Sequence, residues 1–375
     1  MIVEVDTLEP SVISEGPGTV GGEGEGPAEP PRRRWWLGFS IAAAVFVCLL
    51  IAAALIKIPY VAVSPGDASA AESRVQIVGA KAYQDAGRVL FVTVSERDLT
   101  ILDSAFAWLD PDTEIRRFDE YYGTKSPTQD RQENLKAMNS SKDFATYVAL
   151  HKLGYPIKVR NGGALVADTV AGAPSSKVLK RNDLIVALDG HDIGLPSDIP
   201  LALKGHSVGD VVTLRVRRNG QTAIETVSVA LTRRADGAAI IGIVPAIPAT
   251  VQFDFPVHVD IGTGAIGGPS AGLAFTLATL DRLTPGSLTG GKIVAVTGTI
   301  DLDGNVGPIG GLAQKTIAVL RANADLFIVP KTEMADAVKA ARGSRLRVVG
   351  VTTLDEALSV LQQGGGTALP APIAA

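Results

Sequence analysis

The pattern of hydrophobic and polar residues changes its period along the chain. After Pro245, segments with a strand period alternate with segments that repeat every three or four residues. This alternation indicates an α/β domain, whose bounds we set at residues 245–362, with residues 363–375 as a flexible tail. The predicted strands are 257–261, 293–297, 326–329 and 346–351, and the predicted helices are 270–281, 311–323, 332–342 and one that begins at Thr353.

Residues 156–232 have a different pattern, with short strands separated by turns. Residues 179–190 read L-x-x-x-D-x-I-x-x-x-D-G, and residues 209–220 read G-D-x-V-x-L-x-V-x-R-N-G. These motifs resemble those of a bacterial PDZ domain, although Asn182 stands where a glycine is usual. The resemblance implies a β-rich domain that binds peptide C-termini by strand addition. The sequence reveals no carboxylate-binding loop, so a β-rich spacer without a ligand remains an alternative.

The N-terminal part is polar first and then strongly apolar. Residues 1–31 are rich in Gly, Glu and Pro, which predicts a disordered tail. Residues 35–57 contain an uncharged run that is long enough to span a bilayer, and three arginines precede it. The positive charge predicts a single-pass protein of the cell membrane, with a cytoplasmic N-terminus and extracytoplasmic domains. A cleaved secretory signal, with Ala52–Ala54 as its site, is the competing interpretation.

Residues 58–155 show a weaker periodicity of hydrophobic and polar residues. We predict a strand at 89–94, a turn-rich stretch at 110–133 and a helix at 141–153. The segment is expected to be an extracytoplasmic α/β region that packs on the C-terminal domain. Its sequence shows no candidate chemistry.

Composition excludes several classes of protein. The formal net charge of −4 gives no basic footprint for nucleic acid. The single cysteine and four scattered histidines supply neither a disulfide framework nor a metal centre. We therefore expect no metal, no cofactor and no nucleic-acid partner.

The most informative stretch joins a strand to a helix through glycines. Residues 262–267 read G-x-G-x-x-G, and Pro269 then opens a helix whose first turn holds Ser270. Free backbone N–H groups at such a junction suit either a phosphate or the oxyanion formed by a serine nucleophile. Dinucleotide binding also requires an acidic residue about 20 residues further on, and Asp281 and Asp301 are misplaced for it. An ordinary helix-start serine remains the alternative.

A serine nucleophile requires a base, and Lys315 is the best candidate in this domain. On a helix it shares an apolar face with Leu312, Val319 and Ala322. Burial there would favour the neutral amine, which can accept a proton. A lysine that extends along the helix surface to reach solvent is the alternative.

Three blocks carry a further resemblance, namely 268–272 (GPSAG), 297–298 (TG) and 307–315 (GPIGGLAQK). Their residue types, order and separation resemble the proteolytic domain of Lon proteases. The resemblance implies a nucleophilic Ser270, a general base at Lys315 and a supporting Thr297. It also implies an oxyanion hole built from the backbone at Gly268, Pro269 and Ala271. Two family carboxylates are missing, because Gly267 and Thr299 occupy their positions.

One other motif is a false lead. Residues 286–293 nearly spell a nucleotide-binding P-loop, but isoleucine occupies the Ser/Thr position and a strand follows where a helix is required. No nucleotide is therefore expected. The sequence predicts an ATP-independent, membrane-anchored serine endopeptidase that cleaves flexible extracytoplasmic polypeptides, with a PDZ domain for substrate binding or gating. The resemblance also implies a homo-oligomeric ring. The rival hypotheses are a non-catalytic membrane-anchored PDZ scaffold and a nucleotide-binding domain.

Overall fold

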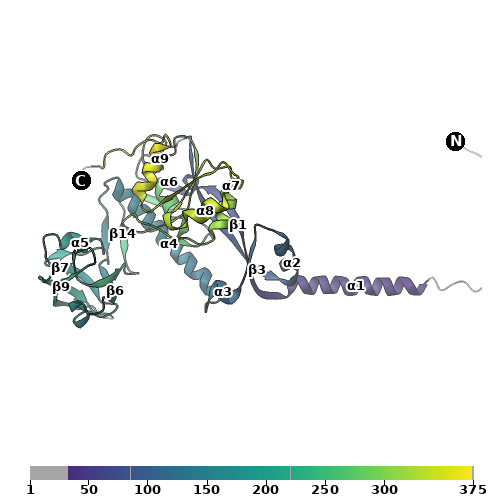
Figure 1. The fold of residues 1–375 in the computed structure, drawn as a ribbon, viewed down its shortest axis with the longest axis horizontal. Helices are drawn as coiled ribbons and strands as arrows, with labels where there is room; N and C mark the ends of the chain where they lie inside the picture. The colour runs from purple at the N-terminus through teal and green to yellow at the C-terminus, as the bar shows by residue number, and fades with distance from the viewer. Residues whose placement is uncertain (1–32, 85, 220, 374–375) are drawn as a thin grey trace, which may run out of the picture. The chain divides into compact units, whose positions relative to one another are not determined.

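The computed structural model describes residues 33–84, 86–219 and 221–373. Residues 1–31, the expected disordered tail, lie outside this described part. The chain divides after Leu55 into two compact units. In Figure 1 the first of these appears as a single helix, α1, and the second contains every strand.

Helix α1 (Arg33–Leu55) forms the described part of the first unit. Its window Gly38–Leu55 is long and apolar enough to cross a membrane, and it is the one such helix among the described residues. A secretory signal near an N-terminus meets the same criterion. The helix ends two residues earlier than the predicted span, because Lys57 already begins the first strand.

The larger sheet of the second unit has six strands in the order β20-β19-β16-β3-β1-β4. The first four strands of this order run parallel, whereas β1 is antiparallel to both of its neighbours. Half of the sheet therefore comes from the region before residue 120 and half from the region after residue 290. The bounds are β1 (Lys57–Ala70), β3 (Arg88–Thr100), β4 (Glu114–Arg117), β16 (Ile293–Val296), β19 (Leu326–Pro330) and β20 (Arg347–Val351).

Helices cover both faces of this sheet, because the side chains of its central strands alternate between two cores. Phe91 and Ile328 face a core shared with α4 (Pro127–Lys152), α6 (Gly272–Leu283) and α9 (Leu354–Gln363). Leu90 and Phe327 face the opposite core, which is closed by α7 (Leu312–Arg321) and α8 (Met334–Ala340). The result is an arrangement of three layers, and it belongs to the α/β class that the sequence pattern indicated.

A second sheet has the strand order β10-β9-β7-β6-β13, with β8 paired to β7. Its core includes Ile185, Leu214 and Ile241. In Figure 1, β6, β7, β9 and α5 cluster together, and β14 lies next to this group. The bounds are β6 (Ala164–Thr169), β7 (Leu184–Leu188), β8 (His191–Asp192), α5 (Asp198–Ala202), β9 (Val211–Arg217), β10 (Ile224–Ala230) and β13 (Ile243–Ala246).

The chain enters and leaves this second sheet through paired strands. β5 (Lys158–Arg160) precedes the sheet, β14 (Gln252–Asp254) follows it, and the two are antiparallel partners. Residues 164–246 are thus an insertion between two parts of the α/β fold. Other short pairs join β2 (Val75–Val78) to β15 (His258–Ile261), β11 (Thr232–Arg233) to β12 (Ala239–Ile240), and β17 (Thr299–Ile300) to β18 (Val306–Gly307).

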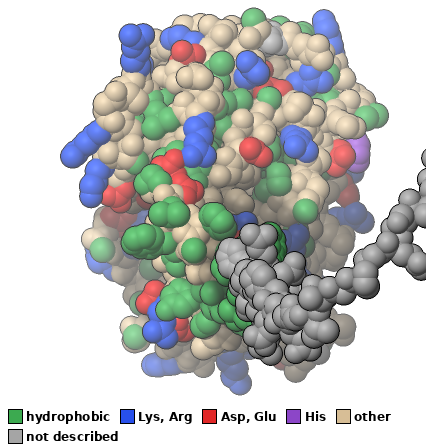
Figure 2. Space-filling view, turned by 90° about the vertical axis from the view of Figure 1, so that its right-hand side faces the viewer, with side chains coloured by type: hydrophobic (Ala, Val, Ile, Leu, Met, Phe, Trp, Pro, Cys, Tyr) green, Lys and Arg blue, Asp and Glu red, His purple; other side chains and the backbone are tan. Residues whose placement is uncertain are grey.

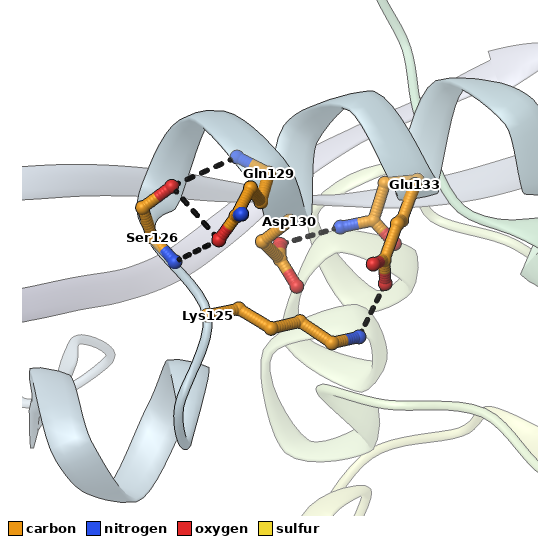
Figure 3. Close-up of polar contacts among 6 residues, drawn as sticks. Lys125, Ser126, Gln129, Asp130 and Glu133 are labelled. Carbon is orange, nitrogen blue, oxygen red and sulfur yellow. Dashed lines mark hydrogen bonds and ion pairs between the residues drawn. The ribbon is translucent and has the colours of Figure 1, made fainter.

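Helix α4 is 26 residues long and begins 14 residues before the helix that we predicted at 141–153. Part of the predicted turn-rich stretch is therefore helical, including α3 (Phe118–Tyr122) and the first turns of α4. Ser126 and Gln129 form a capping box at the start of α4, with Pro127 in the first turn (Figure 3). Lys125 also contacts Glu133 there. α2 (Ile101–Leu109) is the remaining α-helix of the described residues.

The segment that we expected to be a flexible tail makes backbone hydrogen bonds to the domain. Thr367 N–H donates to Ser287, and Ile373 N–H donates to the carbonyl of Leu153. Leu369 also packs against the main core. These contacts tie the chain end to α4 and to the loop before β16.

Candidate functional site

Ser270 lies in the turn between β15 and α6. The chain leaves β15 at Ile261, passes the glycine loop and reaches a 3-10 turn at Pro269–Ala271. Gly268 before this turn has φ of 88°, a backbone conformation that favours glycine. α6 then begins at Gly272, and almost all of its side chains are buried in the core. Ser270 is therefore held, half-buried, at the mouth of a rigid helix.

Lys315 comes from α7, on the other side of the sheet from α6. Its side chain is only 3% exposed, so it does not extend along the helix to solvent. Burial lowers the pKa of Lys315 to about 8, against the opposing charges of Glu333 and Glu96. The amine can therefore be neutral near physiological pH.

The structure brings the three predicted side chains together. Lys315 Nζ lies 2.8 Å from Ser270 Oγ and 3.5 Å from Thr297 Oγ1. Thr297 is fully buried and its hydroxyl donates to the carbonyl of Ser270 at 3.2 Å. The N–H of Gly298 donates to the same carbonyl at 2.8 Å. Thr297 and Gly298 thus fix the serine backbone while Lys315 contacts its hydroxyl.

Helix α4 holds the serine loop from the opposite side, a role that the sequence did not reveal. The N–H of Gly268 donates to the carbonyl of Asn134 at 2.8 Å, and Ser141 Oγ donates to the carbonyl of Pro269 at 3.1 Å. A Cβ added at Gly267 would lie 3.0 Å from the Cβ of Asn134. The position that carries an acidic residue in many Lon proteases is therefore in close contact with α4 here.

These contacts correct the predicted oxyanion hole. Pro269 has no N–H to donate. The N–H of Gly268 is already hydrogen-bonded to Asn134. Of the three backbone positions assigned from the resemblance, Ala271 is left as a candidate donor, together with the N–H of Ser270 itself.

Two carboxylates near the lysine come from elements that the sequence reasoning did not connect to it. Glu333, just before α8, accepts a hydrogen bond from the N–H of Ile309 at 3.0 Å. Its other carboxylate oxygen is buried and has no hydrogen-bond partner among the described residues. Glu96 on β3 accepts from the Tyr121 hydroxyl at 2.5 Å. Both carboxylates act on Lys315 through their charge.

A cleft of about 780 Å³ gives access to the site. Ser270 and Lys315 line it together with Val92–Asp98 of β3 and the first turns of α4. A second hollow of about 350 Å³ lies beside Gly262–Gly264 and shares Leu135, Met138 and Ile266 with the first. The two hollows therefore meet along α4.

The competing ligand sites are not supported by the fold. In a dinucleotide-binding fold, the strand before the G-x-G-x-x-G loop belongs to the parallel sheet. Here that strand, β15, pairs antiparallel with β2 in a separate two-stranded sheet. The P-loop-like residues 286–293 lead into β16. The described residues contain no group of metal-ligating side chains. On the face drawn in Figure 2, basic and acidic side chains of the described residues are interspersed.

Residues 224–363 match the family model of the Lon protease C-terminal proteolytic domain. The chain carries a Lon-type proteolytic domain. Residues 136–231 match the PDZ domain model. The Lon-type match contains Ser270, Thr297 and Lys315, whereas β1, β3 and the first turns of α4 lie outside both matches.

Curated relatives agree with the Lon-type match. The Lon protease of Azospirillum brasilense is 40% identical over 111 residues, which are 28% of this chain and 13% of that protein. The Lon protease of Trichlorobacter lovleyi is 37% identical over 108 residues, with the same coverage. That of Methylocella silvestris is 32% identical over 159 residues, or 41% of this chain and 18% of the relative. The matched part is thus less than a fifth of each of these relatives, and it supports a serine protease.

Two solved structures are similar to part of the chain. The PDZ domain of the SdrC-like protein from Listeria monocytogenes is 28% identical, covering 24% of this chain and 92% of that one, with a TM-score of 0.22. The corresponding domain from Listeria innocua is 25% identical, covering 22% and 92%, with a TM-score of 0.21.

Proposed function

We propose that this chain is a serine endopeptidase in which Ser270 is the nucleophile and Lys315 the general base. The observation that carries the proposal is the distance of 2.8 Å between Lys315 Nζ and Ser270 Oγ, with the amine buried. A hydroxyl is a weak nucleophile until a neighbouring base takes its proton. A buried amine whose pKa is lowered to about 8 can take that proton near neutral pH.

The proposed reaction follows from this arrangement. The neutral amine of Lys315 accepts the proton of Ser270 Oγ as the oxygen attacks the scissile carbonyl carbon. The resulting ammonium then gives its proton to the leaving amine, which leaves an acyl ester on Ser270. Water attacks this ester with Lys315 again as base, which releases the acid and restores the serine. Thr297 acts as a positioning residue, because its hydroxyl contacts both the lysine amine and the serine carbonyl.

Flexible polypeptides are the proposed substrates. The pairing of β3 with β16 ends at Phe91, and beyond it β1 is the one strand partner of β3 among the described residues. The other edge of β3 is therefore unpaired there, and the same residues line the cleft. An extended chain can add to such an edge through main-chain hydrogen bonds, largely without regard to side chains. An unfolded or flexible chain can present such an extended segment along its whole length. The sequence offers no nucleotide motif in a fitting context, so we propose that cleavage is independent of ATP.

We further propose that α1 anchors the enzyme in the cell membrane with the catalytic domain outside the cytoplasm. The run of arginines on the N-terminal side of the apolar stretch supports that orientation. The inserted PDZ domain would bind substrates or gate access, since β13 is an edge strand of its sheet and can accept a peptide. Its entry and exit strands pair with each other, and the chain before them is α4, which contacts the serine loop. A homo-oligomeric ring stays a proposal by resemblance.

Two variants test the catalytic proposal in the full-length protein. Ser270→Ala removes the nucleophile, and Lys315→Arg keeps a cation that cannot lose its proton at working pH. Both should abolish cleavage of an unfolded test protein. The matched controls Ser359→Ala and Lys339→Arg change exposed residues on α9 and α8 and should cleave normally. Retained cleavage in either dyad variant would refute the proposal, and labelling of Ser270 by a phosphonate probe separates an enzyme from a scaffold.

A further inference from the structure

Helix α2 presents an apolar surface to its surroundings. Seven of its nine residues, ILDSAFAWL, are hydrophobic, yet only Ala107 is buried. Soluble helices normally direct their apolar stripe inward and their polar side outward. Here the opposite holds, since Asp103 and Ser104 lie on the same side as buried Ala107.

The outward face of α2 is continuous. At 3.6 residues per turn, its apolar side chains cover an arc of roughly 160°. Contiguous apolar surface of this kind marks an interaction site. The strongly exposed members are Ile101 (45%), Phe106 (64%), Trp108 (80%) and Leu109 (70%).

The position of α2 in the chain indicates what covers this face. The N–H of Ile101, its first residue, donates to the carbonyl of Ile56, which directly follows the last residue of α1. Lys57 pairs with Thr100 beside it. α2 is about 14 Å long at 1.5 Å per residue, so its far end lies within about that distance of the hydrogen bond to Ile56, the residue at which the second unit begins.

We propose that α2 is an interfacial helix that inserts Phe106, Trp108 and Leu109 into the outer leaflet of the membrane. The inference rests on the proposed membrane anchor. Aromatic side chains are enriched at the boundary between headgroups and acyl chains, and a short apolar helix there lies in the plane of the membrane. This second attachment would hold the α/β domain against the bilayer, so that the enzyme acts on chains that emerge at the membrane surface.

Tryptophan quenching in the full-length protein tests this proposal. The chain has three tryptophans, Trp35, Trp36 and Trp108. Replacing the first two by phenylalanine leaves Trp108 as the reporter. A variant that retains Trp36 alone reports on the anchor, and a variant without native tryptophans that carries Leu201→Trp reports on the exposed surface of the inserted domain. Each is reconstituted in phosphatidylcholine–phosphatidylglycerol vesicles with brominated acyl chains.

The expected result is a blue-shifted Trp108 emission that loses intensity to brominated lipid, as that of Trp36 does. The tryptophan emission of the Leu201→Trp variant should instead be quenched by aqueous iodide and not by brominated lipid. Iodide quenching of Trp108 would overturn the proposal, and so would protection from both quenchers, because the latter indicates that a second copy of the chain covers α2. If brominated lipid does not quench the Trp36 reporter and the protein does not float with the vesicles, the proposal that α1 anchors the protein in a membrane is refuted.

A triple variant provides an independent readout. Phe106→Ser, Trp108→Ser and Leu109→Ser replace exposed side chains away from the cleft. Cleavage of a soluble unfolded protein should be unchanged, while cleavage of a vesicle-tethered peptide with a short linker should fall. Equal loss on both substrates, or loss on neither, would contradict the proposal.

Discussion

The two walls of the catalytic cleft hold the same serine by different means. The first wall, made of the turn Pro269–Ala271 and of α7 with the adjoining Thr297, provides side chains, namely the hydroxyls of Ser270 and Thr297 and the amine of Lys315. The wall that includes α4 holds the serine loop through the backbone carbonyl of Asn134 and the hydroxyl of Ser141. The first wall lies within the Lon-type match and the first turns of α4 lie outside it. The reactive side chains and the α4 groups that hold the serine loop are therefore encoded in separate parts of the chain.

The largest effect should come from removing the amine of the first wall. Lys315→Met should lower peptidase activity by about 10²–10⁴-fold, the usual contribution of a general base. The same change should stabilise the fold at pH 7. The folded-state pKa of Lys315 is lowered to about 8 from 10.5, so below pH 8 the buried ammonium destabilises the protein. That cost is up to about 3 kcal/mol at roughly 1.4 kcal/mol per pKa unit.

Urea unfolding at several pH values measures this stabilisation. The gain in unfolding free energy should be complete below pH 8 and should disappear as the pH rises towards 10.5, where the lysine is neutral in both states. If Lys315→Met instead lowered stability by the same amount at every pH, burial of the Lys315 ammonium would not be destabilising the folded protein.

Crowding the second wall should have the next largest effect. Gly267→Ala places a Cβ 3.0 Å from Asn134, which α4 can accommodate only by moving away from the serine loop. Overpacking of this kind costs about 1–3 kcal/mol, and a displaced nucleophile can cost up to about 10²-fold in rate. Gly262→Ala in the same loop is the control, because its nearest neighbour would be 3.9 Å away. Equal activity of the two variants would show that the contact between α4 and the serine loop does not affect catalysis.

Removing one hydrogen bond of the second wall should have a smaller effect. Ser141→Ala deletes the bond from Ser141 Oγ to the carbonyl of Pro269, worth about 1 kcal/mol. We expect a modest fall in kcat with little change in KM, since the loop that carries Ser270 loosens. The adjacent exposed Ser140 supplies the matched variant Ser140→Ala, which should behave as the parent. A change confined to KM would assign Ser141 to substrate binding.

The smallest effect should be a shift in pH dependence. Glu333→Gln removes a charge that raises the pKa of Lys315 while keeping an acceptor for the N–H of Ile309. The pH at which kcat rises should therefore move lower, with the plateau unchanged. Glu333→Ala also frees the loop before α7, so its plateau should fall. An unshifted profile in Glu333→Gln would show that this charge does not reach the lysine.

Residue type and periodicity pointed to Ser270 and Lys315 of the first wall, the resemblance to the Lon proteolytic domain added Thr297, and the roles of all three stay predictions. Ser270, Thr297 and Lys315 lie in short motifs whose local structure follows from glycine, proline and helical periodicity, and the structure places their side chains in contact. The parallel strands and helices after residue 290 were also predicted close to their observed bounds. Local pattern decides these elements.

The second wall could not be found in the same way. The carbonyl of Asn134 is a backbone group that every residue possesses, and β2 pairs with β15 across an insertion of more than 80 residues. The start of α4 did have a signal, since Ser126, Pro127 and Gln129 form a capping box. The polar first turns of α4 lack an apolar stripe, and this concealed the helix.

The rate at which a fluorophosphonate labels Ser270, measured against pH, tests the central claim most directly. This rate reports the nucleophile and its base without substrate binding or product release. If the neutral amine of Lys315 activates Ser270, the rate rises with pH through about 8 in the parent protein and is lost in Lys315→Met. A labelling rate that does not depend on pH, or that is unchanged in Lys315→Met, would contradict the claim that Lys315 activates Ser270.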